Sequence, residues 1–102
     1  MRAKKIDAPQ VAIVKALRQY GCSVTHLHEV GRGCPDLLLG IHGKTGLLEL
    51  KDGAKPPSAR KRTPDQEKWM AEWKGGPAGL ATDVDSALRF ARMLAFGDEN
   101  GR

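Results

Sequence analysis

The sequence has few cysteines, few aromatic residues and no long apolar run. Among its 102 residues are only two cysteines, Cys22 and Cys34, which are too few for a framework of disulfide bonds. The longest nearly unbroken apolar run, Leu37 to Ile41, is far shorter than the roughly 20 residues that span a bilayer. The basic residues at the start lead into Asp7 rather than into an apolar stretch, so no secretory signal is expected. We therefore expect a cytoplasmic protein with reduced cysteines and no membrane partner.

The chain does contain an excess of positive charge. Its 17 Lys and Arg residues against 12 Asp and Glu residues give a formal net charge of +5, which favours a polyanionic partner such as nucleic acid. The length suits one domain over residues 1–102, with a core from about residue 6 to 96 and a polar tail over 97–102. A domain of this size can bury enough surface to fold without disulfide bonds or structural metals.

Apolar periodicity and capping signals predict the order helix, three strands, helix, strand, helix. Residues 52–62 lack large apolar side chains and carry four positive charges against one negative, so we expect a surface loop, called here the basic segment. The predicted fold class is α/β, a mixed four-stranded sheet flanked by helices. The expected helices cover residues 7–20, 64–74 and 84–95, and the expected strands cover residues 23–30, 36–41, 47–51 and 78–82.

The second and third strands are expected to form a hairpin with one polar face. A two-residue loop with glycine first favours a turn at Gly43 and Lys44, which places Asp36 opposite Lys51. Because side chains alternate between the faces of a sheet, Asp36, Glu49 and Lys51 then share one face. The opposite, apolar face is expected to hold Leu37, Leu39, Ile41, Leu48 and Leu50.

Two carboxylates and one ammonium group beside a basic segment suggest metal-dependent chemistry. Carboxylate oxygens are ligands of hard divalent cations, so we expect Mg²⁺ or Mn²⁺ at Asp36 and Glu49, and no organic cofactor. Such a cation can activate water and polarise a phosphoryl group, while Lys51 orients the water or offsets charge. Phosphodiester hydrolysis in DNA fits this set. The residues expected to contact DNA are Arg32, Lys55, Arg60, Lys61 and Arg62.

The spacing of these residues resembles a nuclease signature. Gly33-Cys34-Pro35-Asp36 is followed, after twelve residues, by Glu49-Leu50-Lys51, which is similar to the motif of PD-(D/E)XK nucleases. The predicted element order resembles their restriction-endonuclease-like fold. From Ile6 to Leu94 the chain resembles the small stand-alone, phage- or prophage-associated members related to the VRR-NUC group.

The resemblance implies a role for each matching residue. Asp36 and Glu49 would bind the metal together with the backbone carbonyl of Leu50, and Lys51 would serve catalysis. Gln66, in the helix after the hairpin, matches a Gln that recurs near these sites. The family also often has an acidic residue on its first helix, for which Asp7 is the candidate; Gln10 stands one turn on, where many relatives use Glu. Small members pair two cleavage centres, so a homodimer is expected, and branched DNA is one substrate class to consider.

Several residues also have simpler interpretations. Gln66 lies three positions after Thr63, which is the spacing of a capping box, and Asp7 can simply cap the first helix. Trp69 and Trp73 are spaced i and i+4, and such a pair is more often a core or subunit contact than a base-stacking platform. The alternative to a nuclease is a catalytically silent DNA-binding module that uses the same basic segment. The spacing of four further residues matches no usual zinc site: Cys22, His26, His28 and Cys34.

Overall fold

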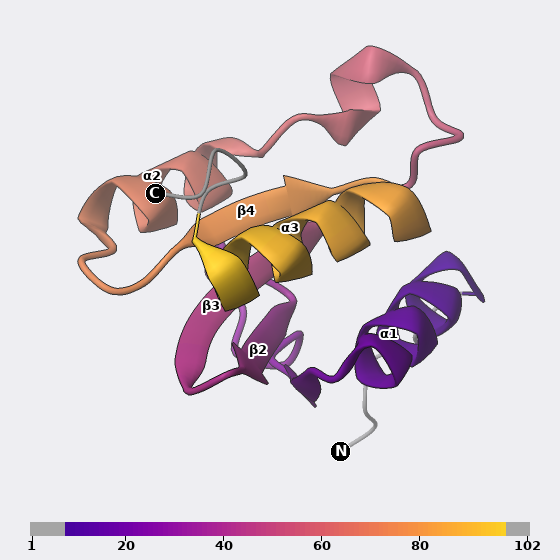
Figure 1. The fold of residues 1–102 in the computed structure, drawn as a ribbon. Coiled ribbons are helices and arrows are strands. Elements are labelled where there is room, and N and C mark those ends of the chain that lie inside the picture. The colour runs from indigo at the N-terminus through magenta and orange to yellow at the C-terminus, as the bar shows by residue number, and fades with distance from the viewer. Residues whose placement is uncertain (1–7, 98–102) are drawn as a thin grey trace.

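The computed structural model describes residues 8–97 and confirms the predicted α/β fold class (Figure 1). None of the helices within that range is long and apolar enough to cross a membrane. The helices are α1 (Ala8–Tyr20), α2 (Pro64–Glu72) and α3 (Val84–Phe96), the strands are β1 (Ser23–His26), β2 (Leu37–Ile41), β3 (Lys44–Leu50) and β4 (Ala78–Ala81), and a short 3₁₀ helix, η1 (Pro57–Arg60), lies in the basic segment.

The four strands form one mixed sheet in the order β1-β2-β3-β4. Strand β2 pairs antiparallel with β1 and with β3, and β4 runs parallel to β3. A parallel neighbour requires a long crossover connection, which here consists of the basic segment and α2. Figure 1 shows α2, the helix of this connection, on the side of the molecule opposite α1.

One face of the sheet forms the core with α1 and α3. Leu37, Leu39 and Leu48 on this face are fully buried, and Leu17 of α1 packs into the same cluster. Helix α3 approaches closely because β4 has a glycine beneath it: a Cβ at Gly79 would lie 2.7 Å from the Phe90 ring. The apolar face expected from the alternation of residues is therefore confirmed.

The hairpin turn lies one residue earlier than predicted. The two loop residues are His42 and Gly43, which have φ angles of 51° and 76°, and the flanking pair is Ile41 with Lys44. Two successive residues with positive φ are typical of a type I′ turn, which follows the right-handed twist of the strands. Histidine is among the residues that tolerate this conformation better than most, so glycine is not needed at the first position.

The predicted pairing of Asp36 with Lys51 is therefore wrong. The observed register pairs Leu37 with Leu48, and one step further along it Asp36 comes opposite Glu49. The shift is two residues, and side chains repeat their face every two residues, so the assignment of residues to faces is unchanged. The two carboxylates thus lie across from each other.

Strand β1 ends at His26, before the predicted end at residue 30. The chain then enters a loop in which Gly31, Arg32 and Gly33 all have positive φ, a conformation that cannot continue a strand. Gly33 lies directly against the first turn of α2, since a Cβ at this position would lie 2.3 Å from the carbonyl oxygen of Asp65. The loop before Asp36 and the start of α2 are thereby brought together.

Candidate active site

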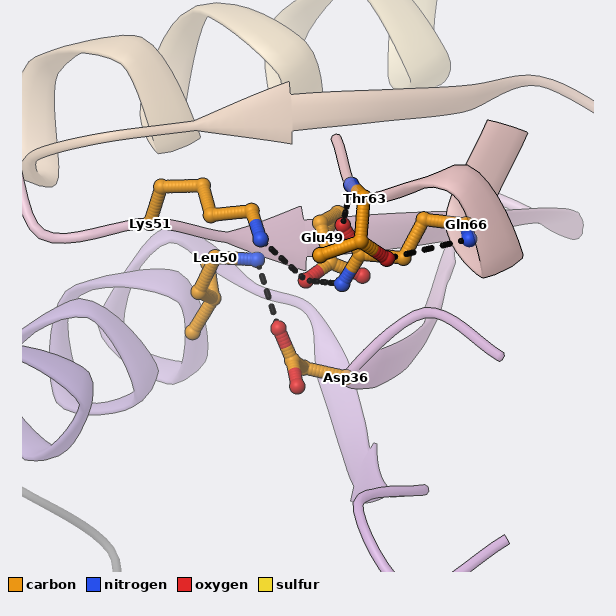
Figure 2. Close-up of polar contacts among 6 residues, drawn as sticks. All are labelled: Asp36, Glu49, Leu50, Lys51, Thr63 and Gln66. Carbon is orange, nitrogen blue, oxygen red and sulfur yellow. Dashed lines mark hydrogen bonds and ion pairs between the residues drawn. The ribbon is translucent and has the colours of Figure 1, made fainter. Parts of the chain in front are cut away.

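Asp36 completes the end of the hairpin with its side chain. The backbone N–H of Leu50 donates to Asp36 Oδ2 at 2.7 Å, just beyond the last pair of β2 and β3 (Figure 2). The carboxylate therefore replaces the strand partner that Leu50 lacks at this point. In a strand, the N–H and C=O of one residue point to the same side, so the Leu50 carbonyl also faces the Asp36 side.

Glu49 is the one buried charged residue in the part of the chain that the structure describes, with an exposed fraction of 5%. Its side chain points away from the core face, because it alternates with Leu48 and Leu50. Its Oε2 accepts a hydrogen bond from Gln66 Nε2 at 2.8 Å and lies 3.9 Å from Lys51 Nζ (Figure 2). Residues of β3 and α2 thus converge on this carboxylate.

The electrostatics of Glu49 are those of a crowded carboxyl pair. Its pKa rises to about 8, first because burial disfavours the charged form and then because of the charge of Asp36 and a hydrogen bond with it. The positive charges of Lys51 and Arg62 lower the pKa but do not offset these effects. The pair can be fully ionised near neutral pH only if further positive charge is supplied.

Gln66 both caps α2 and contacts the proposed active site, two roles that the sequence left as alternatives. Its Oε1 accepts from the backbone N–H of Thr63 at 2.8 Å, and its backbone N–H donates to Thr63 Oγ1 at 3.2 Å, which is a complete capping box. Because the amide oxygen is used by the cap, the amide NH₂ group faces Glu49. One side chain therefore begins α2 and holds the carboxylate.

The residues predicted to contact DNA differ in burial and in their effect on Glu49. Arg62 is close enough for its charge to lower the pKa of Glu49. Arg60 is partly buried, and its Nε has no hydrogen-bond partner within the described residues. The other three side chains are exposed on the surface: Arg32, Lys55 and Lys61.

Two further residues lie beside the site. Burial and the charges of Glu49 and Asp36 raise the pKa of Cys34, which places this thiol near both carboxyl groups. Cys34 was expected only as a small residue beside a turn, although its position two residues before Asp36 was a signal. Gln10 of α1 borders a cavity of about 40 Å³ together with Leu50 and Lys51. Asp7, the other candidate of the first helix, lies outside the described residues.

The donor set fits a hard divalent cation. Asp36, Glu49 and the Leu50 carbonyl offer oxygen atoms only, which are the preferred ligands of Mg²⁺ and Mn²⁺. Between residues 8 and 97 no group of three or more His, Cys, Asp and Glu side chains gathers to hold a metal. Two carboxylates completed by a carbonyl, water and substrate phosphate are typical of Mg²⁺ sites in enzymes that act on phosphates.

Comparison with protein-family models, with curated proteins and with solved structures finds no match for this chain. The resemblance to PD-(D/E)XK nucleases is therefore carried by the motif spacing and the element order alone.

Proposed function

We propose that this protein is a metal-dependent nuclease that hydrolyses phosphodiester bonds in DNA, with branched DNA among its substrates. The observation that carries the proposal is that the Asp36 and Glu49 carboxyl groups lie together at the end of the hairpin. Lys51 and Gln66 both contact the Glu49 carboxylate. A buried acid beside a second carboxylate destabilises a fold unless it is compensated, so the presence of Glu49 next to Asp36 favours a functional role.

Asp36, Glu49 and the Leu50 carbonyl would hold the cation. A bound divalent cation supplies Lewis-acid polarisation of a phosphoryl oxygen and a lowered pKa for water. The repulsion between the carboxylates favours binding of that cation, because its charge allows both groups to ionise.

The remaining residues act on the substrate and on the carboxylates. The Lys51 side chain is 15% exposed, and its ammonium group beside Glu49 is placed to orient the attacking water or to offset the charge that develops on the phosphate. Gln66 fixes the Glu49 carboxylate by donating from its amide. Arg62 and the exposed cations of the basic segment attract the sugar-phosphate backbone without reading its sequence.

The test is cleavage of linear, nicked, flapped and four-way-junction DNA with and without Mn²⁺, alongside binding measured by fluorescence anisotropy. We expect cleavage only with the metal. Asp36→Asn and Glu49→Gln should abolish cleavage while DNA binding holds or strengthens, because each variant loses a metal ligand and a negative charge that faces the phosphate.

A matched control is Asp85→Asn, which removes an exposed carboxylate from the first turn of α3. This variant should cut DNA at the parental rate. If folded Glu49→Gln protein also cuts at the parental rate, the site assignment is wrong. If the parental protein binds DNA and never cuts it with Mn²⁺, the DNA-binding module takes the place of the nuclease.

A further inference from the structure

The only two tryptophans of the chain lie together at the surface, Trp69 in α2 and Trp73 as the residue that caps the C-terminal end of this helix. The rings of Trp69 and Trp73 are stacked, with centroids 5.0 Å apart and planes 19° from parallel. Helix α2 buries none of its residues, and Trp73 is 39% exposed. Large aromatic side chains contribute most when they are buried, so core packing does not account for this pair.

The Trp73 ring is held in one orientation by the turn that follows α2. Its Nε1 donates to the carbonyl of Gly76 at 2.8 Å. The backbone at Gly75 lies against the ring, since a Cβ there would be 2.3 Å from Trp73 Cζ2. The indole N–H is therefore used inside the molecule, and the part of the ring that meets solvent is aromatic carbon. A rigid aromatic surface of this kind loses little entropy when a flat ligand stacks on it.

The stacked pair is continuous with the proposed active site. Gln66, Trp69 and Trp73 are spaced i, i+3 and i+7, so they follow one side of α2 from its first turn to its C-cap. Gln66 on this face donates to Glu49. With a rise of about 1.5 Å per residue, the two indoles begin roughly 4.5 and 10.5 Å beyond Gln66 along the helix axis. The longer distance corresponds to about three stacked nucleotides at about 3.4 Å each.

The charges of α2 indicate which part of a nucleic acid could bind beside Trp69 and Trp73. The helix carries Asp65, Glu67 and Glu72 against a single cation, Lys68, so it does not suit phosphate groups. Phosphates are attracted instead by the adjacent basic segment and by Lys51. An uncharged base is the part that fits the indoles. Only an unpaired or terminal base has a free face, because a base inside a duplex is stacked on both sides.

We propose that Trp69 and Trp73 form a stacking platform for an unpaired base of the DNA whose backbone crosses the Asp36–Glu49 site. This inference rests on the proposed nuclease function and specifies its substrate class. The substrate is DNA with a single-stranded segment or a splayed end within about three nucleotides of the cut, as in flaps and branch points.

Intrinsic fluorescence provides a direct test, because all tryptophan emission comes from this pair. The full chain is titrated in EDTA with a short oligo-dT strand, a flapped duplex and a blunt duplex whose ends are closed by hairpins. We expect quenching by the single strand and the flap, and little by the closed duplex. Trp73→Leu should weaken single-strand binding by about 5- to 150-fold, the range for loss of one base stack, and Trp73→Phe should retain most of the affinity.

The matched control is Tyr20→Leu on α1, because Tyr20 is an aromatic residue of nearly the same exposure, 40%, away from the site. This variant should bind the single strand like the parent.

The proposal is overturned if anisotropy shows that the single strand binds without quenching the fluorescence, or if Trp73→Leu binds the single strand as the parent does. It is also overturned if Trp73→Leu instead separates a dimer, which would make this face a subunit contact. Because the titration contains no metal, quenching without cleavage activity would contradict the nuclease alone, and cleavage without quenching would contradict the platform alone.

Discussion

Glu49 is a buried acid that binds its proton more tightly in the folded protein than in the unfolded chain. Its pKa is about 8 in place of the ordinary 4.5. Between these values the folded state holds more protons, so the free energy of unfolding falls as pH rises. In EDTA we expect the stabilising contribution of Glu49 to be complete below about pH 4.5 and lost as the pH passes about 8. Urea denaturation at a series of pH values measures this.

The matched pair for this experiment is Glu49→Gln and Glu67→Gln. The amide introduced by Glu49→Gln cannot ionise, so the decline over that pH window should become shallower in this variant. Glu67 is exposed on α2, and its replacement should leave the parental slope. Equal slopes in the parent and in Glu49→Gln would show that this carboxyl does not bind its proton as described.

Lys51 contacts Glu49 without being a metal ligand in the proposed site. Lys51→Met should therefore leave Mn²⁺ bound while cleavage falls by about a hundredfold or more, the effect of losing one group that stabilises transition-state charge. The Lys51 charge also lowers the pKa of Glu49, so Mn²⁺ binding in the variant should need a higher pH. Calorimetric titration with Mn²⁺ and single-turnover cleavage measure the two effects. Lys55→Met, in the basic segment, should retain the parental rate of the chemical step.

At the level of elements, the loop before β2 and the start of α2 are joined at Gly33. Gly33→Ala should destabilise the protein by more than the roughly 1–2 kcal/mol of left-handed strain, because the new Cβ would lie 2.3 Å from the Asp65 carbonyl. Displacing Asp65 also displaces Gln66, so Mn²⁺ affinity should fall. Urea denaturation and Mn²⁺ titration are the measurements.

Gly31→Ala is the control for that substitution. Gly31 has a similar φ of 76°, but nothing lies within 4 Å of the added Cβ. The Gly31→Ala variant should therefore lose only the stability that corresponds to the left-handed strain, and it should keep the parental Mn²⁺ affinity. If the two variants lose equal stability and bind Mn²⁺ equally, the contact between Gly33 and Asp65 does not position α2.

The hairpin shows how much of the site could be predicted from the sequence. That Asp36 and Glu49 share a face follows from alternation alone, which a shift of two residues does not alter. Their direct opposition depends on the register, and the register depends on a turn that begins at His42. A preference for glycine at the first turn position led to the wrong pair. Glycine does favour the positive φ angles of two-residue turns, but histidine also adopts the conformation that the first position of this turn needs.

The contact between Gln66 and Glu49 could not be derived from spacing. The two residues are 17 positions apart, and the basic segment between them has no periodicity that would fix the course of the chain. The capping signal at Thr63 predicted where α2 begins, which the structure confirms, but not which face of the sheet the helix covers. Gln66 was expected near the site only because of the resemblance to a nuclease family.

At the level of the whole molecule, we expect a weakly held homodimer. One chain presents a single Asp36–Glu49 site, and cutting two strands calls for two such centres related by symmetry. The apolar contact is expected from the end of α3, where Phe96 is 62% exposed and its ring lies 5.1 Å from that of His42. Phe96→Glu should give a monomer by light scattering, whereas Val11→Glu, which changes another exposed apolar residue, should not. A parental protein that is monomeric at assay concentrations would contradict the expectation.

The distribution of positive charge over the two faces of the sheet predicts how DNA binding responds to salt. Each phosphate contact contributes about 0.9 to the slope of log affinity against log salt concentration. Replacing Arg60, Lys61 and Arg62 together by Gln should therefore flatten the slope by up to about 2.7. The control removes the same charge from exposed positions of α1 and α3, on the opposite face: Lys15, Arg89 and Arg92. If binding depended only on net charge, both triple variants would change the slope equally. If the basic segment contacts the phosphates, anisotropy titrations at several salt concentrations should show the change in the first variant alone.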